Sequence, residues 1–212
     1  MDIAIIGAGN VGGALAGAMT KAGHSVTITA STKDSAEQVA GQTGARAVAT
    51  NGEAVESADV VILAVPYPTV GDVLGEVSDG LDGKVVVDAT NRFNREDPAA
   101  SIDGSSASEQ IQARAPGARV VKAFNTVFAS RQADPVVDGT PLDGFVAGDD
   151  EGAKKAVLAL VESIGFRPID AGPLGMARAL EAMAVLIIGL QIWHNWSWRS
   201  GWKLVGPLGA TE

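Results

Sequence analysis

The 212-residue chain contains no cysteine and only two histidines, His24 and His194. The absence of cysteine excludes disulfides, thiolate metal sites and a cysteine nucleophile. Aromatic residues make up only 5% of the chain, and all four tryptophans fall in the segment 193–202. Basic residues are outnumbered by acidic ones, 16 to 25, and the net charge of −9 argues against a nucleic-acid surface. The sequence therefore predicts neither a metal site nor nucleic-acid binding.

Short apolar runs alternate with helical patterns along the chain. This alternation is typical of βαβ units, so we expect an α/β fold with a mainly parallel sheet. The uninterrupted apolar runs at 59–65 and 84–88 indicate strands that are buried on both faces. Strands are predicted at 3–6, 24–29, 45–48, 59–65, 84–88, 119–123, 143–148 and 166–169, and helices at 13–22, 34–43, 51–58, 69–77, 106–114, 151–165 and 174–194. The segment 94–105 is expected to form a loop, the strand at 166–169 to lie at the edge of the sheet, and Asn51 to cap its helix.

The motif Gly7-x-Gly9-x-x-Gly12 directly follows an apolar run and opens a helical pattern. In such a strand–turn–helix the first glycine permits the tight turn, and the second lets the backbone approach a pyrophosphate. The third lets the helix pack close to the strand. The start of the helix, with Asn10 and Val11, presents free N–H groups to the phosphates. The motif therefore predicts a dinucleotide site, although a glycine-rich turn without a ligand has the same pattern.

The segment after the second predicted strand indicates which dinucleotide binds. Chains that bind NAD usually place Asp or Glu about 20 residues beyond the glycine motif to hold the ribose 2′-hydroxyl. Here these positions are Ser31, Thr32 and Lys33, and no carboxylate occurs before Asp34. Hydroxyls can donate hydrogen bonds to a 2′-phosphate, and Lys33 can neutralise its charge. We therefore predict NADP(H), whether or not Ser31 and Thr32 also cap the next helix.

The ends of the central strands are rich in amides and hydroxyls and carry no carboxylate pair. Ligands of a doubly wound sheet bind at these carboxyl ends, so the cofactor site should also include Ala64, Val65, Pro66, Asn91 and Asn125. Asp88 is expected to accept hydrogen bonds from loop N–H groups, and neither histidine is expected to be catalytic. A dehydrogenase acting on an alcohol needs an acid/base group, whereas hydride transfer between two cofactors does not. We therefore predict an oxidoreductase without a catalytic side chain.

A long apolar helical run occupies Leu174–His194, followed by the tryptophans. It contains Arg178 and Glu181, so its uncharged part is too short to span a membrane. A helix that is apolar on most faces must be buried, and we expect a homodimer contact through residues 174–202. The clustered indoles suit either such an interface or a pocket for a flat ligand. Because the N-terminus lacks a basic segment, we also expect a cytoplasmic protein.

Taken together, several motifs resemble the NADPH:coenzyme F420 oxidoreductase family, also called F420-dependent NADP reductases. They are the Gly7–Gly12 loop, Ser31–Lys33, Ala64–Pro66, Lys122–Thr126, Gly148–Asp150 and, most specifically, Phe166–Leu174 followed by the helix with Arg178 and Glu181. The resemblance implies a Rossmann-type doubly wound domain at 1–170, a small C-terminal helical part at 171–212, and a homodimer. It further implies hydride exchange between NADP(H) and the deazaflavin coenzyme F420, a small-molecule redox co-substrate. Asn125, Pro173 and Leu174 would line the deazaflavin cavity, and Pro66 would flank the nicotinamide.

The chain departs from the archaeal members of this family in three places. Its glycine loop is one residue shorter, Asn125-Thr126 replaces a His-Thr pair, and the tail is rich in tryptophan. Alternative functions are therefore an NADPH-dependent reductase of a flavin, carbonyl or imine compound, and a non-catalytic NADPH-binding sensor. A β-hydroxyacid dehydrogenase would need a larger helical domain and a catalytic lysine, for which Lys122 is the only candidate and is expected within a strand.

Overall fold

The computed structural model describes residues 1–94 and 96–206, so Arg95 of the predicted loop 94–105 and the last six residues lie outside it. Within these residues the chain forms an eight-stranded sheet in the order β10-β9-β6-β5-β4-β1-β2-β3. The strands are β1 (Asp2–Ile6), β2 (Ser25–Thr29), β3 (Arg46–Ala47), β4 (Val60–Leu63), β5 (Val85–Asp88), β6 (Arg119–Lys122), β9 (Asp143–Gly148) and β10 (Arg167–Gly172). A separate hairpin joins β7 (Val136–Val137) to β8 (Thr140–Pro141).

The first six strands are parallel and have the doubly wound order 3-2-1-4-5-6. Every residue of β4 and β5 is buried, as their continuous apolar sequences predict. The order reverses between β1 and β4, and the crevice beyond this switch point is where such sheets bind dinucleotides. β9 runs antiparallel to β6, and β10 forms the predicted edge strand beside it. The predicted doubly wound, mainly parallel fold is therefore confirmed.

Alternate residues along the strands build two cores, one on each face of the sheet. One core contains Ile5 and packs against α1 (Asn10–Lys21), α2 (Lys33–Thr43) and α7 (Glu151–Ser163). The other contains Ile6 and packs against α3 (Asn51–Glu56), α4 (Val70–Val77) and α5 (Ala107–Arg114). This period of two is what places successive side chains of a strand on opposite faces.

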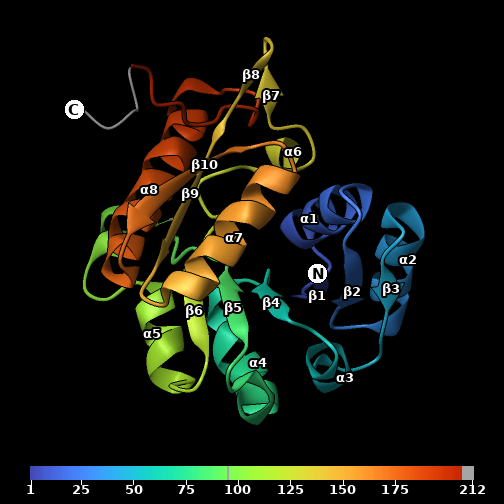
Figure 1. Cartoon of the computed structure of the whole chain (residues 1–212). Helices are drawn as coiled ribbons and strands as arrows, with labels where there is room; N and C mark the ends of the chain where they lie inside the picture. Colours follow the sequence, from blue (N-terminus) through green and yellow to red (C-terminus); the bar gives the residue numbers. More distant parts are fainter. Residues whose placement is uncertain (95, 207–212) are drawn as a thin grey trace, which may run out of the picture.

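The last helix, α8 (Ala177–His194), covers the outer strands β9 and β10 (Figure 1). Leu180 and Met183 of α8 form a third apolar cluster with Phe145 and Ala147 of β9 and with Trp202. The short helix η4 (Leu174–Met176) leads into α8 directly from β10. The C-terminal part of the chain is therefore packed on the sheet that carries the glycine loop.

Beyond α8 the chain turns back across the start of β9. The Asp143 N–H donates to the Trp202 carbonyl at 2.9 Å, and the Leu204 N–H donates to Asp143 Oδ2 at 2.6 Å. Arg167 binds both oxygens of the same carboxylate, at 2.6 and 2.7 Å. Burial alone would raise the pKa of Asp143, but the bonds from Arg167 and Leu204 outweigh it and lower that pKa. Asp143 thus anchors the tail in its ionised form.

Three local expectations differ from the structure. Helix α6 (Ala129–Gln132) and the β7–β8 hairpin were not predicted, because such short elements have no measurable periodicity. The predicted cap of α3 was Asn51, but Thr50 accepts the capping bond from the Glu53 N–H at 3.1 Å. A Thr one residue earlier offers an equivalent acceptor, and this frees the Asn51 amide for other bonds.

Contrary to the expectation from the sequence, the segment Leu174–His194 is long and apolar enough to cross a membrane by length and composition alone. Core helices of water-soluble proteins can have the same length and composition. In this protein, 39% of an 18-residue stretch of the segment is buried. One of its buried side chains is Glu181, whose carboxylate is ion-paired. The helix therefore carries only weak evidence for a membrane span.

Candidate functional site

The three glycines of the motif occupy three different environments at the turn between β1 and α1. Gly7 has φ +113°, and a Cβ there would lie 2.6 Å from the Ala64 carbonyl oxygen. A Cβ on Gly12 would lie 1.8 Å from the Gly7 carbonyl oxygen, so the helix packs against the turn itself. A Cβ on Gly9 would meet no protein atom within 4 Å. Gly7 and Gly12 are thus required by the protein's own packing, whereas Gly9 faces open space.

The open space beside Gly9 is a cavity of about 550 Å³, called here the first cavity. It extends from the glycine loop to the ends of β2 and β4, where Ser31, Ala64, Val65 and Pro66 line it. Its position outside the carboxyl ends of β1, β2 and β4 is that of the adenosine half of a dinucleotide in a doubly wound sheet. Six of the residues predicted to bind the cofactor are therefore grouped around it: Gly7, Gly9, Ser31, Ala64, Val65 and Pro66.

A chain of hydrogen bonds that the sequence did not reveal crosses the far end of the first cavity. Thr29 Oγ1 donates to Asn51 Oδ1 at 2.7 Å, and Asn51 Nδ2 donates to Glu76 Oε2 at 2.7 Å. Asn51, Glu76 and Asp72 all line the cavity. The bonded residues Thr29, Asn51 and Glu76 come from β2, α3 and α4. Nothing in the sequence distinguishes Asn51 and Glu76 from ordinary surface positions of their helices.

The predicted phosphate-binding residues lie at the start of α2. Thr32 is the N-cap of this helix, and its Oγ1 accepts from the Ser35 N–H at 3.3 Å. Lys33 is 72% exposed and forms an ion pair with Glu37 at 3.3 Å. Ser31 and Ser35 line the first cavity, while Thr32 and Lys33 lie just outside its lining. A helix N-terminus with hydroxyls and an ammonium is a suitable environment for a phosphate.

A second cavity, of about 210 Å³, lies on the other side of the start of α1. Val11 borders it, together with Asn91 after β5 and Asn125 and Thr126 after β6. Apolar residues of α8 and the indole of Trp198 complete its wall: Ala184, Ile187 and Ile188 belong to that helix. No side chain that lines this cavity carries a titratable group. The second cavity is thus an amide-bearing, otherwise apolar pocket below the C-terminal helix.

Trp198 is held in this wall by contacts with Phe128 and Ser130, at the start of the short helix α6. Its ring meets the Phe128 ring edge-on with centroids 5.3 Å apart, and its carbonyl oxygen accepts from Ser130 Oγ at 2.6 Å. Trp193, Trp196 and Trp198 are 68%, 48% and 45% exposed, and Trp202 is packed in the third apolar cluster. The four tryptophans therefore have different surroundings, and of the four only Trp198 lines the first or the second cavity.

Next to the second cavity lies a group of buried charges centred on Lys122. Its Nζ donates to Asp88 Oδ2 at 2.9 Å, to Glu181 Oε1 at 3.0 Å and to the Thr90 carbonyl at 2.7 Å. Asp88 also accepts from the Thr90 N–H at 2.9 Å, as the sequence predicted. All three hydrogens of the ammonium group are used, so Lys122 is not available as the acid/base of a β-hydroxyacid dehydrogenase.

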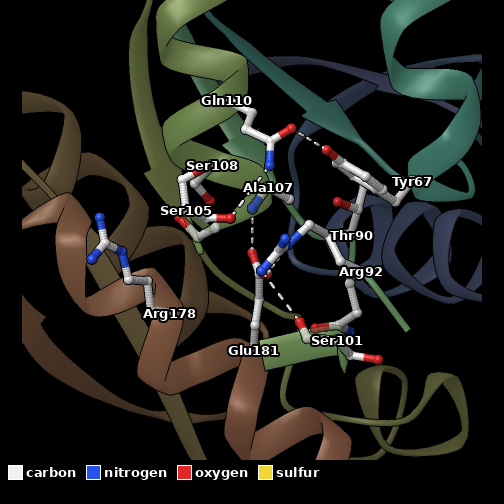
Figure 2. Close-up of polar contacts among 12 residues, drawn as sticks. Tyr67, Thr90, Arg92, Ser101, Ser105, Ala107, Ser108, Gln110, Arg178 and Glu181 are labelled. Atoms are coloured by element: carbon white, nitrogen blue, oxygen red, sulfur yellow. Dashed lines mark hydrogen bonds and ion pairs between the residues drawn. The ribbon is translucent and has the colours of Figure 1, made fainter. Parts of the chain in front are cut away.

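Glu181 connects this group to α5 and to the loop before it (Figure 2). Its carboxylate accepts from the Ala107 N–H at 2.8 Å and from Arg92 Nε at 3.2 Å. One turn earlier in α8, Arg178 binds Glu109 through two bonds of 2.6 and 2.8 Å. The bonds from Arg178 lower the pKa of Glu109 to about 2. These pairs position α8 over the strand ends and hence over the second cavity.

The remaining predicted residues lie apart from both cavities. Leu174 is 3% exposed and packs in the core with Val65 and Tyr67, while Pro173 is exposed before it. Neither lines the first or the second cavity, so their contact with a deazaflavin stays a prediction. His24 bonds to Ser163 Oγ at 2.9 Å, and His194 stacks on Trp196. Across the described residues no cluster of His, Cys, Asp or Glu could hold a metal ion.

Comparisons with known proteins agree with this architecture. Residues 2–92 match the family described as "NADP oxidoreductase coenzyme F420-dependent". The F420-dependent NADP reductase of Methanothermobacter marburgensis is 36% identical over 152 residues, which are 68% of this chain and 67% of that protein. A crystal structure from Arthrobacter sp. FB24, named as a candidate F420-dependent NADP reductase, superposes with a TM-score of 0.87 at 28% identity. The superposed region covers 97% of this chain and 100% of the Arthrobacter chain.

A metalloreductase of Rattus norvegicus is 29% identical over 191 residues, which are 88% of this chain but only 37% of the rat protein. Its match is thus to one part of a larger protein. The chain belongs to the family of F420-dependent NADP reductases and is an oxidoreductase.

Proposed function

We propose that this protein transfers a hydride directly between NADP(H) and the deazaflavin coenzyme F420. The observation that carries the proposal is the second cavity, which adjoins the dinucleotide loop and is lined without any titratable side chain. Reduction of a carbonyl would need a side chain there to deliver a proton, and oxidation of an alcohol would need one to accept a proton. Hydride transfer between two redox cofactors needs only orientation and exclusion of water.

The adenosine half of NADP(H) is assigned to the first cavity. The pyrophosphate would lie over Gly9 and the N-terminus of α1, where the missing Cβ leaves open space. Ser31, Thr32 and Lys33 would hold the 2′-phosphate, with Lys33 turning from its exposed pair with Glu37. An exposed ion pair is worth well under about 1 kcal/mol, so a doubly charged phosphate readily replaces Glu37 as the partner.

The nicotinamide half would follow the strand order toward β5 and β6 and reach the second cavity. Asn91 and Asn125 offer amide groups there, and Val11 and Ile188 offer apolar contacts. The two cofactors supply the hydride chemistry, and the chain's residues stack them and exclude water. Trp198 closes the cavity from the tail and provides a flat surface on which a second ring system can lie.

A homodimer is proposed as the working form. Within α8, the apolar side chains of Leu186, Ile192 and Trp193 are 47%, 45% and 68% exposed. Leu186 and Trp193 are seven residues apart and therefore share a face of the helix. A second copy of the same helix would cover this face by two-fold symmetry. The proposed dimer would also stiffen the helix that roofs the second cavity.

Turnover with each acceptor tests the proposed function. Purified protein is mixed with NADPH and oxidised coenzyme F420, and loss of the deazaflavin's visible absorbance is followed; FMN and FAD are supplied in parallel. We expect rapid reduction of coenzyme F420 and slow or no reduction of the flavins. Reduction of the flavins alone would instead assign the protein to the flavin-reducing alternative.

A further inference from the structure

Asn91 and Asn125, at the ends of β5 and β6, fix each other's side-chain amides. Asn91 Nδ2 donates to the backbone carbonyl of Asn125 at 2.9 Å. The orientation of the Asn91 amide is thereby determined, because its nitrogen side must face that carbonyl. Asn91 Oδ1 is then left to accept from Asn125 Nδ2, also at 2.9 Å.

The second hydrogen of the Asn125 amide is also used inside the protein. Asn125 Nδ2 donates to the carbonyl of Leu180 in α8 at 3.0 Å. Both acceptors are oxygens that cannot donate. If the Asn125 amide were flipped, its Oδ1 would face these two oxygens without a hydrogen between them. The nitrogen side of Asn125 is therefore fixed toward the protein, and its oxygen is fixed on the opposite side.

Asn125 Oδ1 is left without a partner. The residue is only 6% exposed, and no donor within the described chain reaches this oxygen. Buried amide oxygens are normally bonded, because an unpaired buried acceptor loses its bonds to water without replacement. Asn125 lines the second cavity, whose other walls are mainly apolar. The unpaired acceptor and the cavity thus occur at one residue.

We propose that Asn125 Oδ1 is a specificity-determining acceptor that selects ligands presenting an N–H donor in the second cavity. This assignment rests on the proposed function for the identity of the ligands, which offer two such donors. One is the carboxamide N–H of the nicotinamide, and the other is the imide N–H of the deazaflavin ring. The first is attached to a flat ring and the second is part of one, and either would complete the bonding of the buried oxygen.

The direct test removes the donor from each ligand and measures binding by titration calorimetry with the unmodified protein. The acetylpyridine analogue of NADP⁺ replaces the carboxamide nitrogen with a methyl group of similar size. A coenzyme F420 derivative methylated at the imide nitrogen lacks the second donor. We expect one of the two modified ligands to bind at least about tenfold more weakly than its parent, which identifies the donor. Equal affinities within both pairs would overturn the assignment.

Two variants sharpen the comparison. In Asn125→Leu the affinity ratio between the parent ligand and its donor-free analogue should fall to about one, whereas Thr126→Val, which alters the neighbouring cavity residue, should leave that ratio unchanged. A ratio that persists in Asn125→Leu would contradict the assignment. The wild-type comparison needs no variant, so it decides even where Asn125→Leu fails to fold. Failure of NADP⁺ to bind at all would contradict the proposed function, whereas binding without discrimination contradicts this assignment alone.

Discussion

Glu181 Oε1 in α8 lies 3.0 Å from Lys122 Nζ at the end of β6, and their side chains are 2% and 0% exposed. Lys122 is also 2.9 Å from Asp88, and Glu181 is 3.2 Å from Arg92. Two carboxylates and two cations therefore meet where the C-terminal helix crosses the strand ends. A buried group of this kind costs desolvation energy, but removing one partner leaves an uncompensated charge.

Lys122→Met is therefore expected to destabilise the protein by about 3–5 kcal/mol, because the buried Asp88 would lose its counter-charge while Glu181 would keep only Arg92. Urea unfolding followed by circular dichroism measures this change. Glu37→Gln breaks the exposed pair with Lys33 and serves as the control, with an expected loss below about 1 kcal/mol. Similar losses of unfolding free energy in the two variants would show that the buried ion pairs stabilise the protein no more than the exposed pair does.

The glycine loop allows folding to be separated from cofactor binding. Gly9→Ala should leave the unfolding midpoint nearly unchanged, because the new Cβ meets no protein atom within 4 Å, yet it should weaken NADPH binding about tenfold or more. Gly12→Ala should instead destabilise the fold, because its Cβ would overlap the Gly7 carbonyl oxygen. Thermal unfolding and NADPH titration distinguish the two variants. An unaltered NADPH affinity in Gly9→Ala would place the pyrophosphate elsewhere.

Lys33 is expected to contribute to the choice between NADPH and NADH. Lys33→Gln should weaken NADPH binding by about tenfold, roughly 1.4 kcal/mol, and leave NADH binding nearly unchanged. The effect should shrink at high salt, because the side chain is exposed. Lys155→Gln, at an exposed position of α7, is the matched control for the loss of one positive charge. Equal losses for both cofactors would remove the assigned phosphate role.

The exposed face of α8 leads to a prediction about assembly. Trp193→Glu places a charge on this apolar face, near the C-terminal end of α8, so the proposed dimer should dissociate into monomers. Light scattering after size-exclusion chromatography measures the mass directly. Trp202→Phe is not a suitable control, because Trp202 is packed inside the protein; Lys155→Gln serves again. A wild-type protein that is monomeric at micromolar concentration would contradict the proposed dimer.

The parallel sheet and the dinucleotide loop could be predicted because their signals are local. Buried runs such as 60–63 and the spacing of Gly7, Gly9 and Gly12 are properties of short segments. The partners of Lys122 could not be predicted, because Glu181 lies 59 residues away and reaches it only through the packing of α8. Asn51 was misassigned for the same reason, since its bonds to Thr29 and Glu76 join three elements. A cytoplasmic location remains a prediction from the sequence.

The measurement that tests the central claim most directly uses NADPH carrying deuterium at both C4 positions of the nicotinamide. The protein is incubated with this NADPH and coenzyme F420 in ordinary water, and the reduced deazaflavin is analysed by mass spectrometry. Direct transfer in a cavity without titratable side chains predicts one deuterium in each molecule of reduced deazaflavin formed at early times. Reduced deazaflavin that contains no deuterium, or no reduction of coenzyme F420 at all, would contradict direct transfer between the two cofactors.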